Sequence, residues 1–264
     1  MTAMTLATDT PSADLTGLTV FVTGANRGLG AGFVSAALER GAARVFAGAR
    51  DPASVQERVG VVPLRLDLND RGSISAAAAA TCGPVDLVVA NAGAALPGPS
   101  IGPDAADVRR LFETNVFAQL DLVESFRPAL AASKGSFVWV ASVVALILSR
   151  SSPAYSASKA AGMLVMQGLR TQLADEGISV VVVFPGFVET DATVRMPVPK
   201  ASPMEVAGRS LDAWSAGDPS IFPDRYAVMV REALGPGLAR VMADPHAAAT
   251  ALVSKYRSDA KADP

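Results

Sequence analysis

Hydrophobic residues in this chain gather in short continuous runs, separated by longer Ala-rich amphipathic stretches. The runs are rich in β-branched residues, and several are apolar throughout, as expected of parallel strands that are covered on both faces. They predict strands over Leu18–Val22, Arg44–Ala49, Val61–Leu66, Asp86–Asn91, Ser136–Ser142 and Ser179–Pro185. The stretches between and after them predict helices near residues 29–40, 73–80, 104–131, 154–175 and 203–216.

This alternation of strands and helices predicts an α/β fold, with a single-domain, doubly wound (Rossmann-type) parallel sheet and helices on both of its faces. The sequence contains no Pro-, Gly- or Ser-rich linker and no internal repeat that would divide it. We therefore expect a flexible N-terminus over residues 1–14 and one domain over residues 15–264.

The alternation changes after the sixth predicted strand. Residues 191–222 contain several prolines, and a segment at this place would lie at the carboxyl edge of the sheet, where such folds bind ligands. We expect this segment to act as a substrate loop. A short seventh strand over Ser220–Asp224 and helical stretches near 225–233 and 245–257 are expected next, the latter two in a C-terminal helical tail over residues 225–264.

Charge and hydropathy exclude several classes of partner. The chain of 264 residues has a net charge of −2, which gives neither a basic footprint for nucleic acid nor a charged patch for a membrane surface. Its first residues lack the basic and apolar regions of a signal peptide. The longest apolar run, Phe137–Leu148, is much shorter than the stretch of about 20 residues that spans a membrane. We expect a cytoplasmic protein.

Cys82 is the only cysteine and His246 the only histidine. A single cysteine excludes a disulfide within the chain, and we interpret Cys82 as a small buried residue. A single histidine near the C-terminus does not readily support a histidine-based zinc site or a Ser-His-Asp triad. We therefore expect no metal site.

The stretch "VTGANRGLGAGF" follows the first predicted strand and opens the first predicted helix. Gly24, Gly28 and Gly30 would let the backbone turn tightly and approach a pyrophosphate at the N-terminus of that helix. The spacing is GxxxGxG rather than the usual GxGxxG. Such glycines also serve plain strand-to-helix turns, but their place at the first strand–helix junction favours a dinucleotide.

The residue that contacts the adenosine ribose is expected at the end of the second strand. The sequence there is "AGARDP", which offers Arg50 for a 2′-phosphate and Asp51 for free ribose hydroxyls. Arg27, within the glycine turn, is a second candidate phosphate ligand, because arginine binds phosphate in a bidentate manner. We therefore favour NADP(H), and NAD(H) remains the alternative through Asp51.

Seven motifs occur in an order that is specific as a set. They are "TGANRGLG" at 23–30, "DL" at 67–68, "NAG" at 91–93, Asn115, Ser142, "YSASK" at 155–159 and "PGFVET" at 185–190. Over roughly residues 15–195 the chain resembles the short-chain dehydrogenase/reductase family, of the NADP-preferring type. The resemblance weakens after Thr190 and says little about the C-terminal tail.

The resemblance implies roles for individual residues. Asn115, Ser142, Tyr155 and Lys159 match the catalytic tetrad. Asp67 would contact the adenine, Asn91 would steady the central strand, and Thr190 would hold the nicotinamide carboxamide. The full set of implied cofactor contacts is Gly24, Asn26, Arg27, Gly28, Leu29, Gly30, Arg50, Asp67, Leu68, Asn91, Ala92, Gly93, Tyr155, Lys159, Pro185, Gly186, Val188 and Thr190.

Tyr155 and Lys159 would lie on one face of a helix, because residues i and i+4 are neighbours there. An ammonium about 4 Å from the phenol would lower the pKa of Tyr155 by up to about 3 units and make it a general acid/base. Lys159 would also bind the nicotinamide ribose. Ser142 would donate to the same substrate oxygen, and Asn115 would support a proton relay to Lys159.

The substrate is less legible from the sequence. Candidate lining residues are Ala94, Val143, Val144, Leu148, Phe187, Met196 and Trp214, although core packing is an equal alternative for Trp214. They favour an apolar ketone, aldehyde or secondary alcohol as the substrate. Arg150 or Arg195, if it faced the pocket, would instead favour a carboxylate or a phosphate ester. The family resemblance implies a homodimer or homotetramer built on the helices near 104–131 and 154–175, whose apolar residues could equally belong to the core. A catalytically idle NADP(H)-binding regulator is the alternative function.

Overall fold

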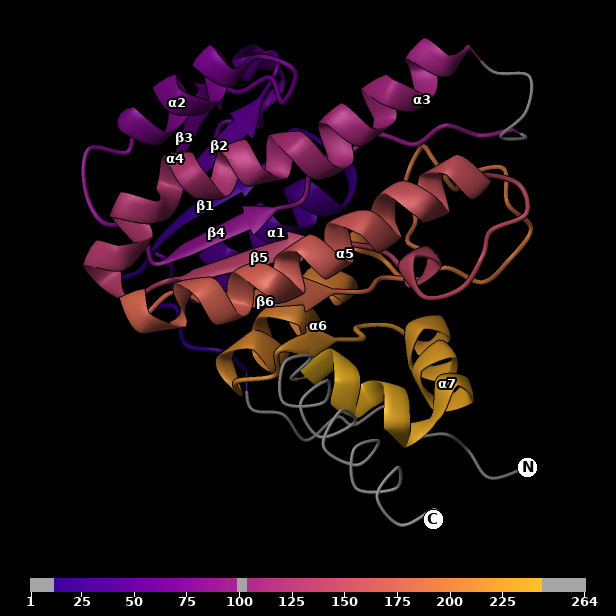
Figure 1. Ribbon diagram of the computed structural model, residues 1–264. Coiled ribbons are helices and arrows are strands. Elements are labelled where there is room, and N and C mark those ends of the chain that lie inside the picture. The colour runs from indigo at the N-terminus through magenta and orange to yellow at the C-terminus, as the bar shows by residue number, and fades with distance from the viewer. Residues whose placement is uncertain (1–11, 99–103, 244–264) are drawn as a thin grey trace, which may run out of the picture.

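The computed structural model describes residues 12–98 and 104–243. Its centre is a seven-stranded, all-parallel sheet in the order β3-β2-β1-β4-β5-β6-β7 (Figure 1). The strands are β1 (Thr19–Thr23), β2 (Arg44–Ala49), β3 (Val61–Arg65), β4 (Leu87–Ala90), β5 (Ser136–Val140), β6 (Ser179–Val183) and β7 (Ser220–Ile221). The helices are α1 (Gly28–Glu39), α2 (Arg71–Ala79), α3 (Ala105–Phe112), α4 (Ala118–Ser133), α5 (Pro153–Leu173), α6 (Pro203–Ser215) and α7 (Arg225–Ala243). The predicted doubly wound α/β fold is confirmed.

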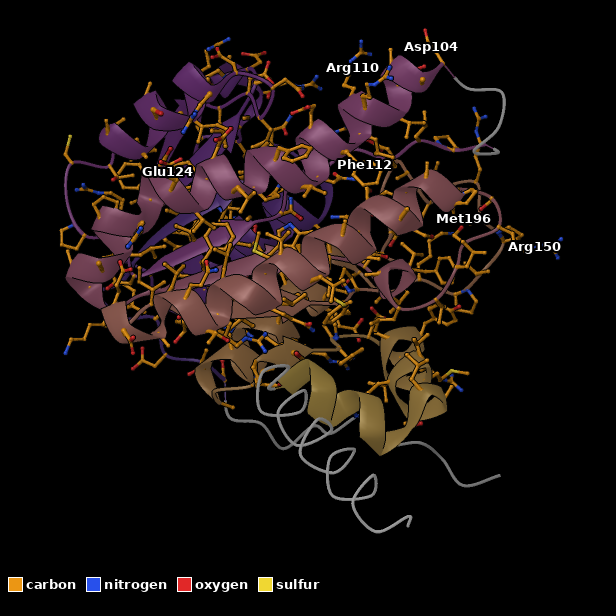
Figure 2. All side chains as sticks on the ribbon, in the orientation of Figure 1. Asp104, Arg110, Phe112, Glu124, Arg150 and Met196 are labelled. Atoms are coloured by element: carbon orange, nitrogen blue, oxygen red, sulfur yellow. The ribbon has the colours of Figure 1, made fainter. Side chains whose placement is uncertain are left out.

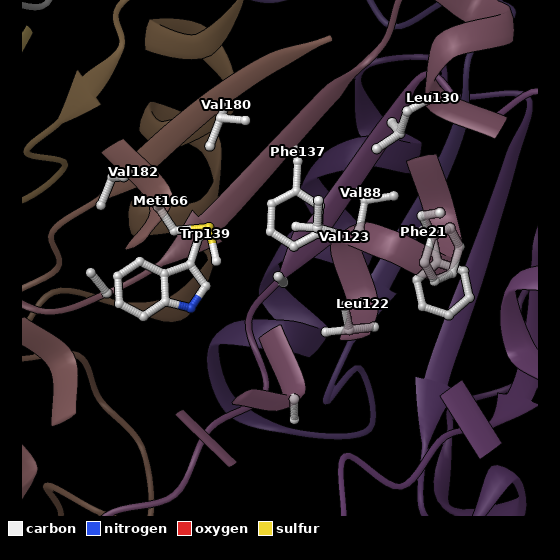
Figure 3. Close-up of a cluster of buried hydrophobic side chains, with 14 of the residues drawn as sticks. Phe21, Val88, Leu122, Val123, Leu130, Phe137, Trp139, Met166, Val180 and Val182 are labelled. Atoms are coloured by element: carbon white, nitrogen blue, oxygen red, sulfur yellow. The ribbon is translucent and has the colours of Figure 1, made fainter. Parts of the chain in front are cut away.

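Side chains that alternate along the central strands feed two hydrophobic clusters, one on each face of the sheet. The first cluster joins the sheet to α2, α4 and α5, and Phe21, Phe137 and Trp139 belong to it (Figure 3). The second joins the sheet to α1 and α6. Because β4 and β5 are buried at every residue, their sequences are apolar throughout, apart from Ser136 at the start of β5, instead of alternating. The edge strand β3 is the one that contains a proline, Pro63, as expected where a ladder hydrogen bond is dispensable.

Two predicted helices differ from the structure. The stretch 104–131 forms two helices, α3 and α4, joined by a π-helical turn over Glu113–Phe117. The helix expected near 225–233 continues to Ala243, with Gly235 in a non-helical conformation (φ +76°) inside it. The helix expected near 245–257 and His246 lie outside the described residues. The predicted burial of Cys82 is wrong, because this residue is exposed after the end of α2.

The segment 191–222 contains the helix predicted near 203–216, which is α6. This helix packs against α1 beside the sheet, whereas Asp191, Ala192, Val194, Lys200 and Pro203, at or before its start, line the cleft at the carboxyl edge. Trp214 packs against the second hydrophobic cluster and not against a ligand site. The role of a substrate loop, predicted for this segment, stays a prediction.

An ion pair fastens α6 to α1. The guanidinium of Arg40 contacts both carboxylate oxygens of Asp212 at 2.9 Å. The side chains are only 13% and 18% exposed, respectively. The backbone N–H of Ala13 donates to the same carboxylate at 2.9 Å, and Ala13 is buried. The described end of the N-terminus, which the sequence predicted to be flexible, is thus held against α6. No helix among the described residues has the length and apolar character to span a membrane.

We expect Asp212→Ala to lower the free energy of unfolding by about 2 kcal/mol, because it leaves the partly buried guanidinium of Arg40 without its partner. The measurement is equilibrium urea denaturation followed by circular dichroism. Glu124→Ala is the control, because Glu124 pairs with Arg71 on the surface of α4 (Figure 2) and should change stability by less than about 1 kcal/mol. Equal effects of the two substitutions would contradict the prediction.

Candidate active site

A cleft of about 1500 Å³ opens at the carboxyl ends of the strands, around the point where the strand order reverses between β1 and β4. Most of the residues predicted to contact the cofactor line it. These are Gly24, Asn26, Arg27, Gly28, Leu29, Arg50, Asp67, Leu68, Asn91, Ala92, Gly93 and Thr190. The cleft is thus formed by segments that lie far apart in the sequence.

The glycine turn brings the N-terminus of α1 to the floor of this cleft. Gly24 and Gly28 have φ values of +63° and +54°, a region that side chains disfavour. A Cβ on Gly30 would lie 2.0 Å from the carbonyl oxygen of Gly24. The backbone can therefore fold this closely only with glycine at position 30, and the first N–H groups of α1 are left facing the cleft, as a pyrophosphate site requires.

Asn91 holds the ends of β1 and β4 together. Its Nδ2 donates to the carbonyl oxygen of Thr23 at 3.1 Å, and the N–H of Ala92 donates to Thr23 Oγ1 at 2.8 Å. This is the steadying contact that the family resemblance implied for Asn91. These two hydrogen bonds hold the first residues after β4 against the end of β1, beside the glycine turn.

Arg50 and Asp51 both line the cleft at the end of β2, but they are used differently. The carboxylate of Asp51 accepts a hydrogen bond from the N–H of Ala53 at 3.1 Å and caps the 3₁₀ turn Pro52–Ser54. Arg50 is exposed and has no ion-pair partner among the residues that the structure describes. Its guanidinium is therefore available to a ligand, whereas Asp51 already serves the backbone.

An ion pair spans the cleft from the glycine turn to the segment after β6. Arg27 Nη1 lies 2.5 Å from Asp191 Oδ2, and the two side chains are 68% and 80% exposed. Both residues line the cleft. The second predicted phosphate ligand is thus paired with a carboxylate that sequence analysis did not single out.

Asn115 lies in the π-helical turn before α4 and is fully buried. Its Oδ1 accepts from the N–H of Ala94 at 2.8 Å, and its Nδ2 donates to Ala94 O and to Ser158 Oγ, both at 2.9 Å. One amide therefore fixes the segment after β4 against α5. The extra residue in the turn is typical of π-bulges, which occur often at functional sites.

Lys159, on α5, is buried, and its Nζ donates to the carbonyl oxygen of Val140 at 2.9 Å. The same Nζ lies 5.9 Å from the centre of the Tyr155 ring. A Cβ placed on Gly93 would be 3.4 Å from Lys159 Nζ and 3.1 Å from Asn115 Oδ1. Because Gly93 lines the cleft, both polar groups lie immediately behind its inner wall.

Ser142 and Tyr155 complete the group of four predicted catalytic residues. Ser142 follows the end of β5, is buried, and caps a 3₁₀ turn by accepting from Val144 N–H at 3.3 Å. Tyr155 stands in the first turn of α5, partly exposed, and its side chain hydrogen-bonds with that of Ser142. The structure therefore brings the hydroxyl of Ser142, the phenol of Tyr155 and the ammonium of Lys159 together from two elements.

Burial controls the protonation of this group. It raises the pKa of Tyr155 to about 12, although the hydrogen bond with Ser142 opposes the change. Burial also lowers the pKa of Lys159 to about 7. The predicted net lowering of the pKa of Tyr155 is therefore wrong, because desolvation disfavours both the phenolate and the ammonium and outweighs their attraction for each other.

The remaining predicted residues lie behind or beside the cleft. Pro185 O accepts from the N–H of Val143 at 3.0 Å, and Gly186 N–H donates to the buried carboxylate of Asp224 at 2.6 Å. Val188 is buried in the second cluster, and neither Pro185 nor Gly186 is among the residues that line the cleft. This turn therefore contacts the segment that follows Ser142 and does not line the cleft.

The predicted substrate-lining residues do not gather in one place. Ala94 lines the cleft, whereas Val143 and Val144 belong to or pack on the first hydrophobic cluster. Leu148 and Met196 are exposed, at 68% and 40%. The centre of the Phe187 ring lies 4.8 Å from that of Tyr226 on α7. Trp214 is partly buried and packs against the second hydrophobic cluster.

Sequence analysis missed several residues of the site. Asp107, Arg110 and Thr114, on α3 and the π-helical turn, line the cleft, and Figure 2 shows Arg110 projecting from α3. Asp224, which binds the turn after β6, was also missed. An acidic residue directly before a predicted helix is a capping signal that could have drawn attention to Asp224.

Comparisons with known proteins agree with this architecture. The model of the short chain dehydrogenase family matches residues 18–199. Ketoacyl reductase HetN from Nostoc sp. is 29% identical over 218 residues, which are 75% of this chain and 76% of the relative. The matched regions span 56% to 76% of the first three curated relatives.

Two solved structures extend the comparison. A short chain dehydrogenase from Burkholderia cenocepacia J2315 in complex with NADP is 31% identical, with a TM-score of 0.80, over 85% of this chain and 95% of that chain. The NADPH-bound carbonyl reductase from chicken fatty liver is 29% identical, with a TM-score of 0.71, over 78% and 89%. The chain belongs to the short chain dehydrogenase family, a family of oxidoreductases.

The depressed pKa of Lys159 gives a prediction about stability. Between pH 7 and pH 10.5 the unfolded chain binds a proton at this lysine that the folded chain does not, so the contribution of Lys159 to stability rises with pH over that range. We expect Lys159→Met to raise the free energy of unfolding by about 2 kcal/mol at pH 6, where the folded protein must bury the ammonium, and by progressively less toward pH 10.

Denaturant titrations across this pH range test the expectation. Lys200→Met is the matched control, because it removes a lysine at the surface, where its ammonium donates to Met196 O. A pH-independent effect of Lys159→Met would contradict the assignment.

Proposed function

We propose that this protein is an NADP(H)-dependent oxidoreductase that interconverts an apolar ketone or aldehyde and the corresponding alcohol, with Tyr155 as the general acid/base. The observation that carries the proposal is the meeting of Ser142, Tyr155 and Lys159 behind Gly93, at the inner wall of the cleft. A hydroxyl, a phenol and a buried ammonium do not readily meet by chance beside a cleft that is lined by a glycine turn and a helix N-terminus.

The residues of the cleft fit a dinucleotide. The closely folded glycine turn leaves room for a pyrophosphate at the N-terminus of α1, where backbone N–H groups bind anions well. Arg50 would bind the 2′-phosphate, since its guanidinium is available and the carboxylate of Asp51 already accepts from Ala53. The NADP and NADPH bound to the two structural relatives also support NADP(H) over NAD(H).

The nicotinamide of bound NADP(H) supplies or accepts the hydride, and the protein manages the proton. With its pKa raised to about 12, Tyr155 is a neutral phenol at pH 7 and can donate its proton to the oxygen of a carbonyl group whose carbon receives the hydride. The addition of the hydride and the proton converts the carbonyl into the alcohol. Ser142 would hydrogen-bond to the same oxygen and stabilise the charge that develops there.

Lys159 and Asn115 support this proton transfer. Once Tyr155 has given up its proton, the nearby Lys159 ammonium would stabilise the phenolate, and the same ammonium would bond to ribose hydroxyls. Asn115 fixes the segment after β4 against α5 through Ala94 and Ser158, which keeps Lys159 facing Gly93. This arrangement supports reduction at neutral pH, because the acid is fully protonated there.

The apolar substrate is supported by the exposed residues around the carboxyl edge. Leu148 and Val194 are both 68% exposed, and Met196 is 40% exposed. Figure 2 shows Met196 and Arg150 at the end of the molecule where the segments after β4, β5 and β6 gather. Arg150 and Arg195 are exposed, so neither fixes a buried positive charge for a carboxylate or phosphate substrate.

The Tyr155→Phe variant tests the chemistry. We expect it to lower NADPH-dependent reduction of apolar ketones and aldehydes by at least about 100-fold, because the proton donor is lost, while the affinity for NADPH stays within a few-fold. Nicotinamide absorbance measures turnover and nicotinamide fluorescence measures binding. Undiminished turnover would exclude Tyr155 as the acid, and tight binding without turnover by the unsubstituted protein would favour the regulatory alternative.

The Arg50→Ala variant tests the choice of cofactor. We expect the dissociation constant for NADPH to rise about 10- to 100-fold, since a charge-assisted contact to phosphate is lost, and that for NADH to stay the same. Arg44→Ala is the matched control, because it removes the same charge from the opposite end of β2. A preference of the unsubstituted protein for NADH would contradict the proposal and favour Asp51 as the ribose ligand.

A further inference from the structure

Trp139 lies directly against the buried ammonium of the site. Lys159 Nζ is 4.9 Å from the centre of the indole ring, and the same Nζ donates to the carbonyl oxygen of the next residue, Val140. Trp139 is fully buried in β5, at one end of the cluster that also contains Met166 and Val182 (Figure 3). One strand therefore offers the ammonium both an aromatic face and a carbonyl oxygen.

Gly162 on α5 provides the space for this indole. A Cβ at position 162 would lie 2.7 Å from Trp139 Cη2 and 2.8 Å from Cζ2, closer than side-chain carbons approach one another. The helix that carries Lys159 thus lacks a side chain at the point where the six-membered ring of Trp139 packs. The placement of the indole beside the ammonium is built into both elements.

Core packing accounts for the size of the Trp139 side chain but not for its indole N–H group. Trp139 Nε1 is buried and has no hydrogen-bond partner among the described residues, and an unpaired donor is unfavourable in a core. Phenylalanine or leucine would avoid that cost. What indole has beyond them is the most electron-rich aromatic face, which attracts a cation more strongly than phenyl does.

We propose that Trp139 is a positioning residue for Lys159, whose indole face stabilises the ammonium and holds it toward Gly93 and Tyr155. The contribution to the reaction rests on the proposed function. The stabilisation of the ammonium itself does not, and it is measurable in the enzyme without substrate.

The charge of Lys159 depends on few groups. Tyr155, on the same helix, is the titratable group in contact with it, and Asn115 on the π-helical turn, Ser158 and Val140 O present neutral dipoles. Among the described residues, no carboxylate lies within ion-pair distance of Lys159. With burial lowering its pKa to about 7, a modest contribution from Trp139 decides how much of the lysine is charged at neutral pH.

The first experiment leaves Trp139 in place. Trp139 and Trp214 are the only tryptophans, so Trp214→Phe makes Trp139 the sole indole. A positive charge beside an indole shifts its emission, and we expect the emission of Trp139 to titrate with Lys159, below the ordinary pKa of lysine, and to lose this titration in Trp214→Phe/Lys159→Met. Emission that is unchanged between pH 5.5 and pH 10, or a titration that persists without Lys159, would overturn the proposal.

The second experiment measures the pKa of Lys159 directly, by ¹³C NMR of lysine-labelled protein, which contains five lysines. We expect Trp139→Leu to lower this pKa by about one unit and Trp139→Phe to lower it by less, since phenyl keeps part of the aromatic attraction. Phe137→Leu is the matched control, because it removes a fully buried ring from the same strand and cluster without contact to Lys159, and it should leave the pKa unchanged.

An unchanged or raised pKa in Trp139→Leu would overturn the proposal, as would an equal decrease in Phe137→Leu. Both outcomes are independent of turnover. Failure of the proposed reaction, seen as absence of NADPH oxidation, is therefore distinguishable from failure of this inference.

Discussion

All strands of the sheet run in the same direction, so their carboxyl ends meet at one edge, and the site depends on this constraint. The chain passes from β1 to β2 on one side of β1, whereas β4 lies on the other side of β1. The cleft opens at the carboxyl ends of the strands where the strand order reverses in this way. The glycine turn follows β1, Arg50 follows β2, Gly93 follows β4 and Ser142 follows β5. The parallel sheet therefore brings residues that are distant in the sequence close together at one edge.

Desolvation dominates the electrostatics of this edge. It acts on Tyr155 and Lys159 in opposite directions on the pH scale, because one becomes charged by losing a proton and the other by gaining one. Near neutral pH the phenol is consequently protonated, while the lysine is close to the midpoint of its titration. Small changes around Lys159, whether from an aromatic face or from a bound ligand, then have a large effect on its charge.

Much of the fold and of the site was predictable from sequence. Continuous apolar runs predicted buried parallel strands, and the glycine turn, Ser142 and the Tyr155–Lys159 spacing fell on the elements expected of them. Local pattern did not predict the π-helical turn, since one extra residue inside a helix leaves the hydrophobic period almost unchanged. It also did not place Trp214, because packing of α6 on α1 is a tertiary choice, nor the pKa of Tyr155, because burial outweighed a pairwise charge estimate.

Asp224 joins two parts of the molecule that are otherwise separate in the chain. One of its carboxylate oxygens accepts from Gly186 in the turn after β6 and the other from Ala227 in the first turn of α7. Pro185, in the same turn, accepts from the residue that follows Ser142. Hydrogen bonds therefore connect the start of α7, through the turn after β6, to the residue beside Ser142. We expect a ligand that displaces the first turn of α7 to shift the backbone at Ser142 as well.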